Sequence, residues 1–333
     1  MPVIAGNNLT LVDQAKRTDP DGRIAAIAEL LSQSNEILED CPWVEGNLST
    51  GHRTTVRTGL PAVAWRKLNA GVQPSKSTTV QVDEAAGMLE AFGVVDKDLA
   101  ELNGNTSEFR LSENMAFLEA MNQEMATTLF YGDTAVNPER FLGLSSRYGT
   151  VNVNNAQNAD NVIDALGTGT DNTSVWLIGW SPNTVHGIYP KGTQAGLVHE
   201  DLGLDTTTDA AGGRYRAYLD RYQWKCGMAL RDWRYAVRIC NIDVSDLTRN
   251  ASAGADLIDL MTRALERIQS LNGVTPVFYA NRTIRSFLRR QTVNRIASST
   301  LQYDTVAGKP ALRFAEVPIK RVDALLLNEA RVV

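Results

Sequence analysis

Cysteine and histidine are scarce in this chain of 333 residues, which contains three of each. Cys41, Cys226 and Cys240 lie far apart and in no CxxC spacing, so the sequence indicates neither a disulfide framework nor a zinc ribbon. We interpret these thiols as reduced and packed in the interior. His186 and His199 have no third candidate ligand near them in sequence, which argues against a metal site. We therefore predict no metal and no cofactor.

The sequence also lacks membrane and export signals. No stretch approaches the roughly 20 consecutive apolar residues that a membrane-spanning helix needs. The N-terminal stretch MPVIAGNNLTLVDQAKR has neither a basic start nor an apolar run before a small-residue cleavage site. Hydrophobic residues still make up 43% of the chain, enough for real cores. We expect a folded protein with no membrane partner, cytoplasmic when synthesised.

The common catalytic fingerprints are missing as well. The chain contains no GxGxxG after a strand, no GxxxxGK[ST], no HExxH and no GxSxG. A catalytic triad would have to use one of the three histidines, yet no nucleophile stands in a recognised elbow. No pair of carboxylates stands out as an acid and base couple. We predict that the protein is not an enzyme and has no catalytic residues; a soluble oligomeric hydrolase with an unrecognised site stays open as the alternative from another class.

Charge is distributed unevenly along the chain, although the net charge is only −5. Residues 1–130 carry 10 basic and 18 acidic side chains, residues 131–210 carry 3 and 9, and residues 211–333 carry 20 and 11. These charges either neutralise one another within one subunit, or bring acidic N-terminal elements against the basic part of a neighbouring copy. Specific nucleic-acid readout is poorly supported, because the arginines are spread over separate elements without a binding motif.

The N-terminal third reads as one helix followed by a long β-excursion. DPDGRIAAIAELLSQSNEILEDCP has apolar residues at helical spacing, with Asp21 as the start signal and Pro42 as the stop. Residues 47–82 are rich in Thr and Val with short alternating runs, which predicts two paired strands. Their apolar side chains are too few to make a core, and an isolated hairpin is marginal in water. This segment needs another surface to lie on.

The rest of the chain predicts one long helix, long strands and a terminal α/β unit. The helix is expected over 113–131, with Ser112 as N-cap and Gly132 just beyond its end; Leu118, Met121, Met125 and Leu129 share one face. VWLIGW at 175–180 predicts a strand. Within 214–243 the period is two, placing Trp233, Tyr235, Val237 and Ile239 on one face and Asp232, Arg234 and Arg238 on a wet face. Helices over 253–271 and 281–291 flank a strand at PVFYA.

The order of these parts resembles that of the major capsid proteins of tailed bacteriophages, which have the HK97-like fold. The resemblance covers nearly the whole chain. Its most specific stretches are WLIGWSPNTVHGIYPKGTQAGLVHEDLG at 176–203, GMALRDWRYAVRICNID at 227–243, YANRTIRSFLRRQ at 279–291 and VPIKRVDALLLNEARV at 317–332. The resemblance is carried by these stretches taken as a series.

The resemblance implies an α+β fold with four parts: an N-terminal arm over 1–48, an extended hairpin or E-loop over 49–100, a P-domain over 101–252 containing the long spine helix, and an α/β A-domain over 253–333. In many relatives the P-domain strands close the chain, whereas here the Arg-rich strands precede the helix–strand–helix unit. The strand connectivity is therefore expected to be reordered.

The resemblance also implies a structural function. The chain is expected to assemble with itself into hexamers and pentamers of an icosahedral phage head that encloses double-stranded DNA, contacted non-specifically. A scaffolding protein, expected to be separate, and a portal protein are the implied partners, with a decoration protein as an optional one. The location is the virion, after assembly in the host cytoplasm. An encapsulin-like bacterial compartment is the alternative within the same architecture.

Four side chains are predicted to contact neighbouring subunits. Trp65 belongs to the hairpin, whose apolar residues its own segment cannot cover. Tyr189 and Leu197 are the expected apolar anchors of an inter-strand loop in SPNTVHGIYPKGTQAGLVHED, and His199 is the expected hydrogen-bonding partner there. Normal shells from a variant lacking both Tyr189 and Leu197 would rule out that role.

Overall fold

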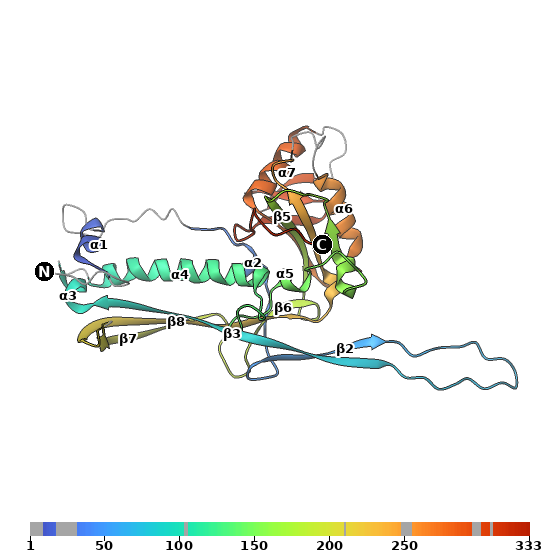
Figure 1. Cartoon of the computed structure of the whole chain (residues 1–333), viewed down its shortest axis with the longest axis horizontal. Coiled ribbons are helices and arrows are strands. Elements are labelled where there is room, and N and C mark those ends of the chain that lie inside the picture. Colours follow the sequence, from blue (N-terminus) through green and yellow to red (C-terminus); the bar gives the residue numbers. More distant parts are fainter. Residues whose placement is uncertain are drawn as a thin grey trace.

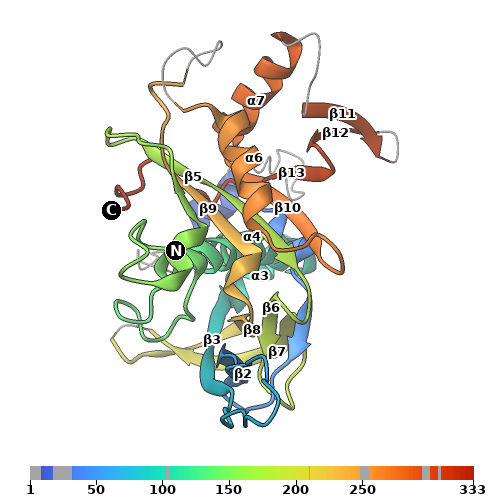
Figure 2. The same ribbon diagram turned by 90° about the vertical axis from the view of Figure 1, so that its right-hand side faces the viewer.

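The computed structural model describes residues 9–17, 32–102, 106–209, 211–247, 255–294, 301–306 and 309–333. A compact unit of strands and helices stands at one end of a long helix, with a layer of long strands beneath that helix (Figures 1 and 2). A hairpin projects from this layer far beyond the body (Figure 1). No helix within the described residues is long and apolar enough to cross a membrane.

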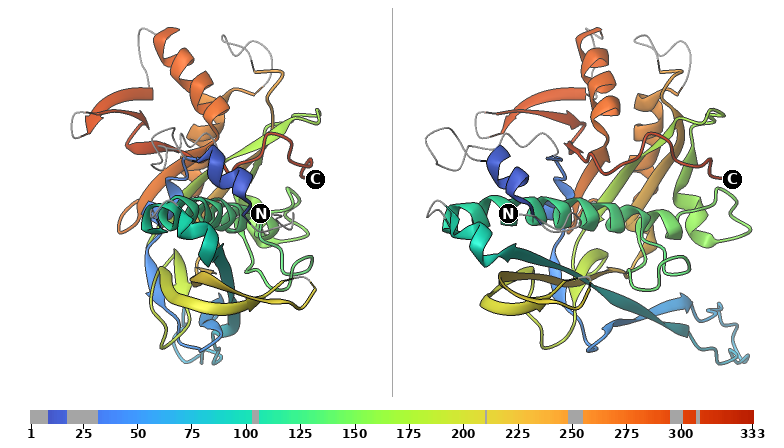
Figure 3. Two further views of the ribbon diagram at one scale, coloured as in Figure 1. Left: turned by 90° about the vertical axis from the view of Figure 1, so that its left-hand side faces the viewer. Right: turned by 60° about the vertical axis from the view of Figure 1, so that its left-hand side comes forward.

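The long helix, α4 (Thr106–Tyr131), runs alongside the long strands (Figures 1 and 3). The helix predicted over 113–131 is right at its C-terminal end but begins too late. Ser112 lies inside α4, where its Oγ donates to the Phe109 carbonyl oxygen (2.8 Å) instead of capping the first turn. Phe109 is fully buried in a small cluster with Val95 and Leu99, and this packing extends the helix beyond its sequence signal.

The end of α4 follows the predicted stop. The Gly132 amide donates to the Thr128 carbonyl oxygen (2.9 Å), which closes the last turn. A Cβ at Gly132 would lie 2.3 Å from the Phe141 carbonyl oxygen, so only glycine fits where the next segment crosses the helix end. Of the predicted apolar face, Met121, Met125 and Leu129 are buried, whereas Leu118 is 40% exposed.

The predicted two-stranded excursion is confirmed, and its second strand is longer than expected. β2 (Gly51–Gly59) pairs antiparallel with the first part of β3 (Thr78–Asp96). The second part of β3 pairs with β8 (Arg214–Leu230), whose other edge takes β7 (Leu197–Thr208). One strand therefore belongs to the projecting hairpin and to the layer under α4.

The compact unit is built on a central sheet. β5 (Asn172–Trp180) lies between two antiparallel neighbours, β9 (Ala236–Asp243) and β10 (Thr275–Ala280). The sheet continues through β13 (Val317–Arg321), which pairs parallel with β10, and β4 (Val162–Asp164), which pairs parallel with β9. These hydrogen bonds link strands from both sides of residue 253, the proposed boundary between P-domain and A-domain.

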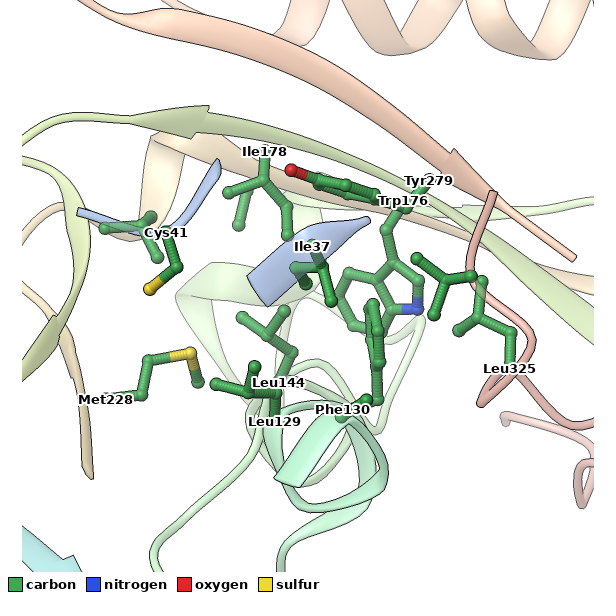
Figure 4. Close-up of a cluster of buried hydrophobic side chains, with 14 of the residues drawn as sticks. Ile37, Cys41, Leu129, Phe130, Leu144, Trp176, Ile178, Met228, Tyr279 and Leu325 are labelled. Carbon is green, nitrogen blue, oxygen red and sulfur yellow. The ribbon is translucent and has the colours of Figure 1, made fainter. Parts of the chain in front are cut away.

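The two faces of β5 serve two cores, because its side chains alternate. Val175 and Leu177 pack with α6 (Leu257–Arg267) and α7 (Arg282–Asn294). Trp176 and Ile178 point to the opposite side, toward the C-terminal part of α4 and α5 (Leu144–Arg147), in the cluster drawn in Figure 4. All three cysteines are free and buried, as predicted.

The smaller elements connect these parts. β1 (Trp43–Glu45) pairs with β6 (Val185–Tyr189), and β6 pairs with β8, so the central sheet continues into the long-strand layer. The remaining elements are α1 (Leu11–Lys16), α2 (Ile37–Asp40), α3 (Lys97–Ala100), the 3-10 turns over Gln157–Asn161 and Trp233–Tyr235, β11 (Leu301–Val306) and β12 (Lys309–Phe314).

The predicted long wet strand through Trp233 and Tyr235 is wrong. Residues 233–235 form a 3-10 turn between β8 and β9, with the Asp232 carboxylate accepting from the Arg234 amide (3.1 Å). β9 is buried on both faces: Ala236 and Cys240 pack in the cluster that contains α4 and α5, and Val237 and Ile239 pack in the cluster that contains α6 and α7. Arg238 is therefore buried and not solvated.

Two helix predictions have different boundaries. The C-terminal helix predicted over 253–271 ends at Arg267 in α6, and Gly273 stands in a later turn with φ +77°. Its predicted start at 253 lies outside the described residues. The N-terminal helix expected from Asp21 falls largely on residues 18–31, also outside them. Its described part is wrong over 32–36, which are not helical, and only Ile37–Asp40 form the single turn α2.

Candidate subunit-contact surfaces

The tip of the hairpin, residues 60–77, presents apolar side chains to solvent. Trp65 is fully exposed, and three further large apolar side chains of the tip are nearly so: Leu60, Val63 and Leu68. The tip extends away from the rest of the molecule, so no other described segment covers it (Figure 1). An exposed apolar group of this kind marks an interaction surface.

The same tip carries positive charge only. Arg66, Lys67 and Lys76 lie within residues 60–77, and no acidic residue lies there. Further back on the hairpin, the Arg53 guanidinium and the Asp83 carboxylate make a cross-strand ion pair (2.6 Å). A surface that received the tip would have to offer apolar contacts and tolerate, or neutralise, three cations.

The root of the hairpin, residues 45–52, lies against residues of the stretch SPNTVHGIYPKGTQAGLVHED. The Gly46 amide donates to the Tyr189 carbonyl oxygen (2.8 Å), and the Lys191 amide donates to the Leu48 carbonyl oxygen (3.1 Å). The Gly192 amide donates to Glu45 Oε1 (2.9 Å). This stretch is therefore largely the seat of the hairpin.

A buried ion pair holds β3 where it passes from the hairpin into the body. Arg147 on α5 donates two hydrogen bonds to Glu84 on β3, at 2.7 and 2.6 Å. Both side chains are about nine-tenths buried or more. A bidentate pair with restricted access to water fixes position as well as charge. The pair therefore fixes β3 at one of the points where the hairpin joins the body.

A polar cluster ties α4 to the strands beneath it. Arg110 on α4 donates to the carboxylates of Asp220 on β8 (3.0 Å) and Asp201 on β7 (2.8 Å). The Arg110 guanidinium holds the pKa of Asp201 below its usual range. His199 Nε2 lies 2.9 Å from Asp220 Oδ1, and its ring stacks on Tyr222 with centroids 4.7 Å apart.

One flank of α4 is apolar and uncovered. Leu111 and Met115 are each 62% exposed and Leu118 is 40% exposed. Their spacing of i, i+4 and i+7 places them on one stripe of the helix. The sheet-facing residues Met121 and Met125 are buried, so α4 has one apolar face inside the subunit and a second one outside.

The described residues contain no group of three or more His, Cys, Asp or Glu side chains that could hold a metal. A small cavity of about 270 Å³ between β3 and α4 is lined by apolar residues such as Met88, Met125 and Phe141, by polar ones such as Glu124, and by Cys226. Burial raises the pKa of the Cys226 thiol, and burial raises the pKa of Cys41 to about 12. Neither thiol is prepared to act as a nucleophile at neutral pH.

Comparison with known families matches residues 19–333 to the family described as major capsid protein GP7. The chain belongs to this family. It is similar to a chain of the bacteriophage Epsilon15 structure, with 36% identity and a TM-score of 0.80 over 100% of this chain and 99% of that one. A comparison with curated proteins gave no match.

More distant solved structures are also similar. The bacteriophage JBD30 capsid gives 10% identity and a TM-score of 0.49, covering 90% of this chain and 93% of that one. The SrpI encapsulin of Synechococcus elongatus gives 11% identity and a TM-score of 0.45, covering 72% and 99%.

Family membership makes this chain a major capsid protein of a tailed phage, and hence a structural component of the virion. The predicted α+β, HK97-like capsid fold is confirmed with it. Along the chain, β8 and β9 precede the α6–β10–α7 unit.

The four predicted contact residues of this capsid protein do not form one patch. Trp65 lies at the hairpin tip, and Tyr189 lies half-buried at the root. Leu197 and His199 stand on β7 beside β8, where they face Trp224 and Tyr222 across the strand pair. Tyr189, Leu197 and His199 are all on strands, not on the inter-strand loop expected.

Two features of the capsid protein were not predicted from its sequence. The Arg147–Glu84 pair joins residues 63 positions apart, and no local pattern reports it. The exposed stripe of Leu111, Met115 and Leu118 did have a signal, because its spacing is helical. Starting the helix at residue 113 left Leu111 outside it and concealed the stripe.

Proposed function

We propose that this capsid protein assembles through its hairpin tip and the α4 flank into hexamers and pentamers, which close an icosahedral head around double-stranded DNA. The observation that carries the proposal is the fully exposed Trp65 on a projecting tip with three more exposed apolar side chains. A single folded chain gains nothing from that exposure, whereas a ring of copies buries it.

A comparison of free energies favours a closed assembly, with several contacts per subunit, over a simple dimer. Burying four large apolar side chains of the tip contributes roughly 6 to 12 kcal/mol, at about 1.5 to 3 kcal/mol each. Association itself costs about 4 to 15 kcal/mol in lost freedom of motion. One tip contact is therefore marginal alone, and stable assembly requires several contacts per subunit, such as the tip and the α4 flank together.

The roles that we propose for the segments follow the four parts expected from the sequence. Residues 1–48 serve as the N-terminal arm, 49–100 as the E-loop, 101–252 as the P-domain and 253–333 as the A-domain. Residues Trp65, Tyr189, Leu197 and His199 are proposed to lie at or near contacts with neighbouring copies. Their different positions on the hairpin and on β7 imply at least two separate contacts.

The proposed partners are a separate scaffolding protein, a portal protein, an optional decoration protein and DNA contacted without sequence specificity, with assembly in the host cytoplasm. The DNA contact rests on charge, since residues 211–333 carry 20 basic and 11 acidic side chains. Uniform native-size shells from the coat protein alone would exclude the need for a scaffolding protein. A packaged enzyme in place of DNA would identify the encapsulin-like alternative.

The central test replaces the apolar tip without touching the core. Trp65→Gln combined with Leu68→Gln is expected to leave the melting temperature unchanged, because both side chains are exposed, and to reduce the yield of particles at least tenfold. Sedimentation and negative-stain microscopy measure that yield, with the coat protein expressed both alone and with a candidate scaffold. Trp65→Phe, which keeps an aromatic ring, is the matched control and should assemble. Normal shells from the double variant would exclude the tip contact.

A further inference from the structure

Two histidines meet at the root of the hairpin. His52 lies on β2 and His186 on β6, with ring centroids 5.9 Å apart and the planes at 81°. His186 is buried, with 1% of its surface exposed. Both of its ring nitrogens, and Nε2 of His52, are buried without a hydrogen-bond partner among the described residues. This contact joins the hairpin to its seat edge-to-face, an arrangement that suits uncharged rings.

The surroundings of the pair oppose positive charge. Arg231, which follows β8, is anchored nearby by donating to the Pro182 carbonyl oxygen (3.1 Å). Glu84 on β3 is the acidic group that acts on His52, but its two oxygens are already engaged by Arg147. A proton on either imidazole would therefore sit beside a second imidazole and a guanidinium, with the Glu84 carboxylate already paired with Arg147.

We propose that the His52–His186 contact is a pH-sensitive latch, which seats the hairpin on the body while both rings are neutral and releases its root when they are protonated. The latch is a property of the unassembled chain. It rests on the proposed function only for its consequence in the shell, where a released root changes the direction in which the hairpin reaches a neighbouring copy.

The sign of the effect follows from burial. Burial, followed by His52 and Arg231, lowers the pKa of His186 from 6.5 to about 4, and burial lowers the pKa of His52 as well. The open root exposes the rings to water and binds protons more readily than the seated root. Seating is therefore complete above about pH 6.5 and weakens as the pH falls toward 4. Titration of His186 alone makes the equilibrium constant for opening the root roughly 20-fold larger at pH 5 than at pH 7.

The chain has only three histidines, so ¹³C-labelled histidine gives three ring signals in an NMR titration of the unassembled chain. His52→Gln, His186→Gln and His199→Gln assign them. The His186 signal is expected to titrate well below the ordinary histidine range, and a His186 signal with an ordinary midpoint would overturn the proposal.

Hydrogen exchange measures the opening itself. After correction for intrinsic exchange chemistry, protection of the amides of Gly46 and Lys191, which bond across the root, is expected to fall about 20-fold between pH 7 and pH 5. His186→Phe keeps a buried ring and should flatten this dependence, whereas His199→Gln, away from the root, should retain it. Equal pH dependence in wild type and His186→Phe would overturn the latch. Particle assembly enters neither measurement, so failure of the latch is distinguishable from failure of the proposed function.

Discussion

At the scale of single residues, Arg238 shows what a strand pattern cannot reveal. Its position opposite Val237 predicts a wet face, yet its guanidinium donates to Glu329 Oε2 (2.8 Å) and to the Tyr148 carbonyl oxygen (2.9 Å). Glu329 also accepts from the hydroxyl groups of Tyr131 and Ser174. Burial, with the Glu329 carboxylate, raises the pKa of Tyr131, so its hydroxyl stays a donor. One buried network thus joins α4, the central sheet and the C-terminal segment.

Removing one charge from this network should be costly. Glu329→Gln leaves the Arg238 guanidinium buried without its counter-charge, which costs about 3 to 5 kcal/mol. Urea unfolding of the unassembled chain measures the loss as a lower midpoint. Asp259→Asn is the matched control, because Asp259 and Arg263 form an exposed pair at 3.9 Å, and its cost should stay within about 0.5 kcal/mol. Equal losses in the two variants would contradict the assignment of Arg238 and Glu329 as a structural junction.

At the scale of elements, hydrophobic periodicity and the residues that start or end elements predicted the features that local interactions determine. The stop of α4 at Gly132, the pairing of β2 with β3, and β10 between two helices all follow from such signals. The failures occur where distant packing decides. α4 starts early because Phe109 is buried against Val95 and Leu99. β9 loses its wet face because one of its faces packs toward α4 and α5 and the other toward α6 and α7.

The candidate contacts divide in the same way. Exposure of Trp65 was predictable, because residues 47–82 contain too few apolar side chains for a core. The positions of Tyr189, Leu197 and His199 depend on which strands pair, and pairing of β6 and β7 with β8 leaves no trace in local sequence. Histidine was expected to bond across a subunit contact, yet His199 already has a partner in Asp220 of its own chain.

The two apolar faces of α4 should respond differently to substitution. Leu111→Gln with Met115→Gln changes only exposed side chains, so the free energy of unfolding should change by less than about 1 kcal/mol. Particle yield should nevertheless collapse if the flank contacts a neighbouring copy. Met125→Ala, on the buried face, should lower stability by about 2 to 5 kcal/mol. Unfolding measured beside sedimentation separates the cases, and normal particles from the double variant would exclude the α4 flank as a contact.

At the scale of the whole molecule, charge is distributed unevenly. The hairpin tip carries Arg66, Lys67 and Lys76 without an acidic residue, while residues 131–210 carry 9 acidic and 3 basic side chains. A basic tip cannot neutralise itself, and its extension keeps it away from acids of its own chain (Figure 1). Complementary charge on a neighbouring copy would steer the encounter and orient it, leaving the apolar contacts to hold it.

Salt separates the charge attraction that would steer the encounter of two copies from the apolar contacts that would hold them together. Arg66→Glu with Lys67→Glu should slow the initial rate of assembly about tenfold in 0.1 M NaCl, where charges act over roughly 10 Å. In 1 M NaCl the range falls to roughly 3 Å, so the variant should approach the wild-type rate. The Trp65→Gln, Leu68→Gln variant should stay defective at both concentrations, because salt does not restore lost apolar area. Light scattering during assembly measures these rates, and a charge-variant defect that persists unchanged in 1 M NaCl would show that the tip cations make short-range contacts and do not steer.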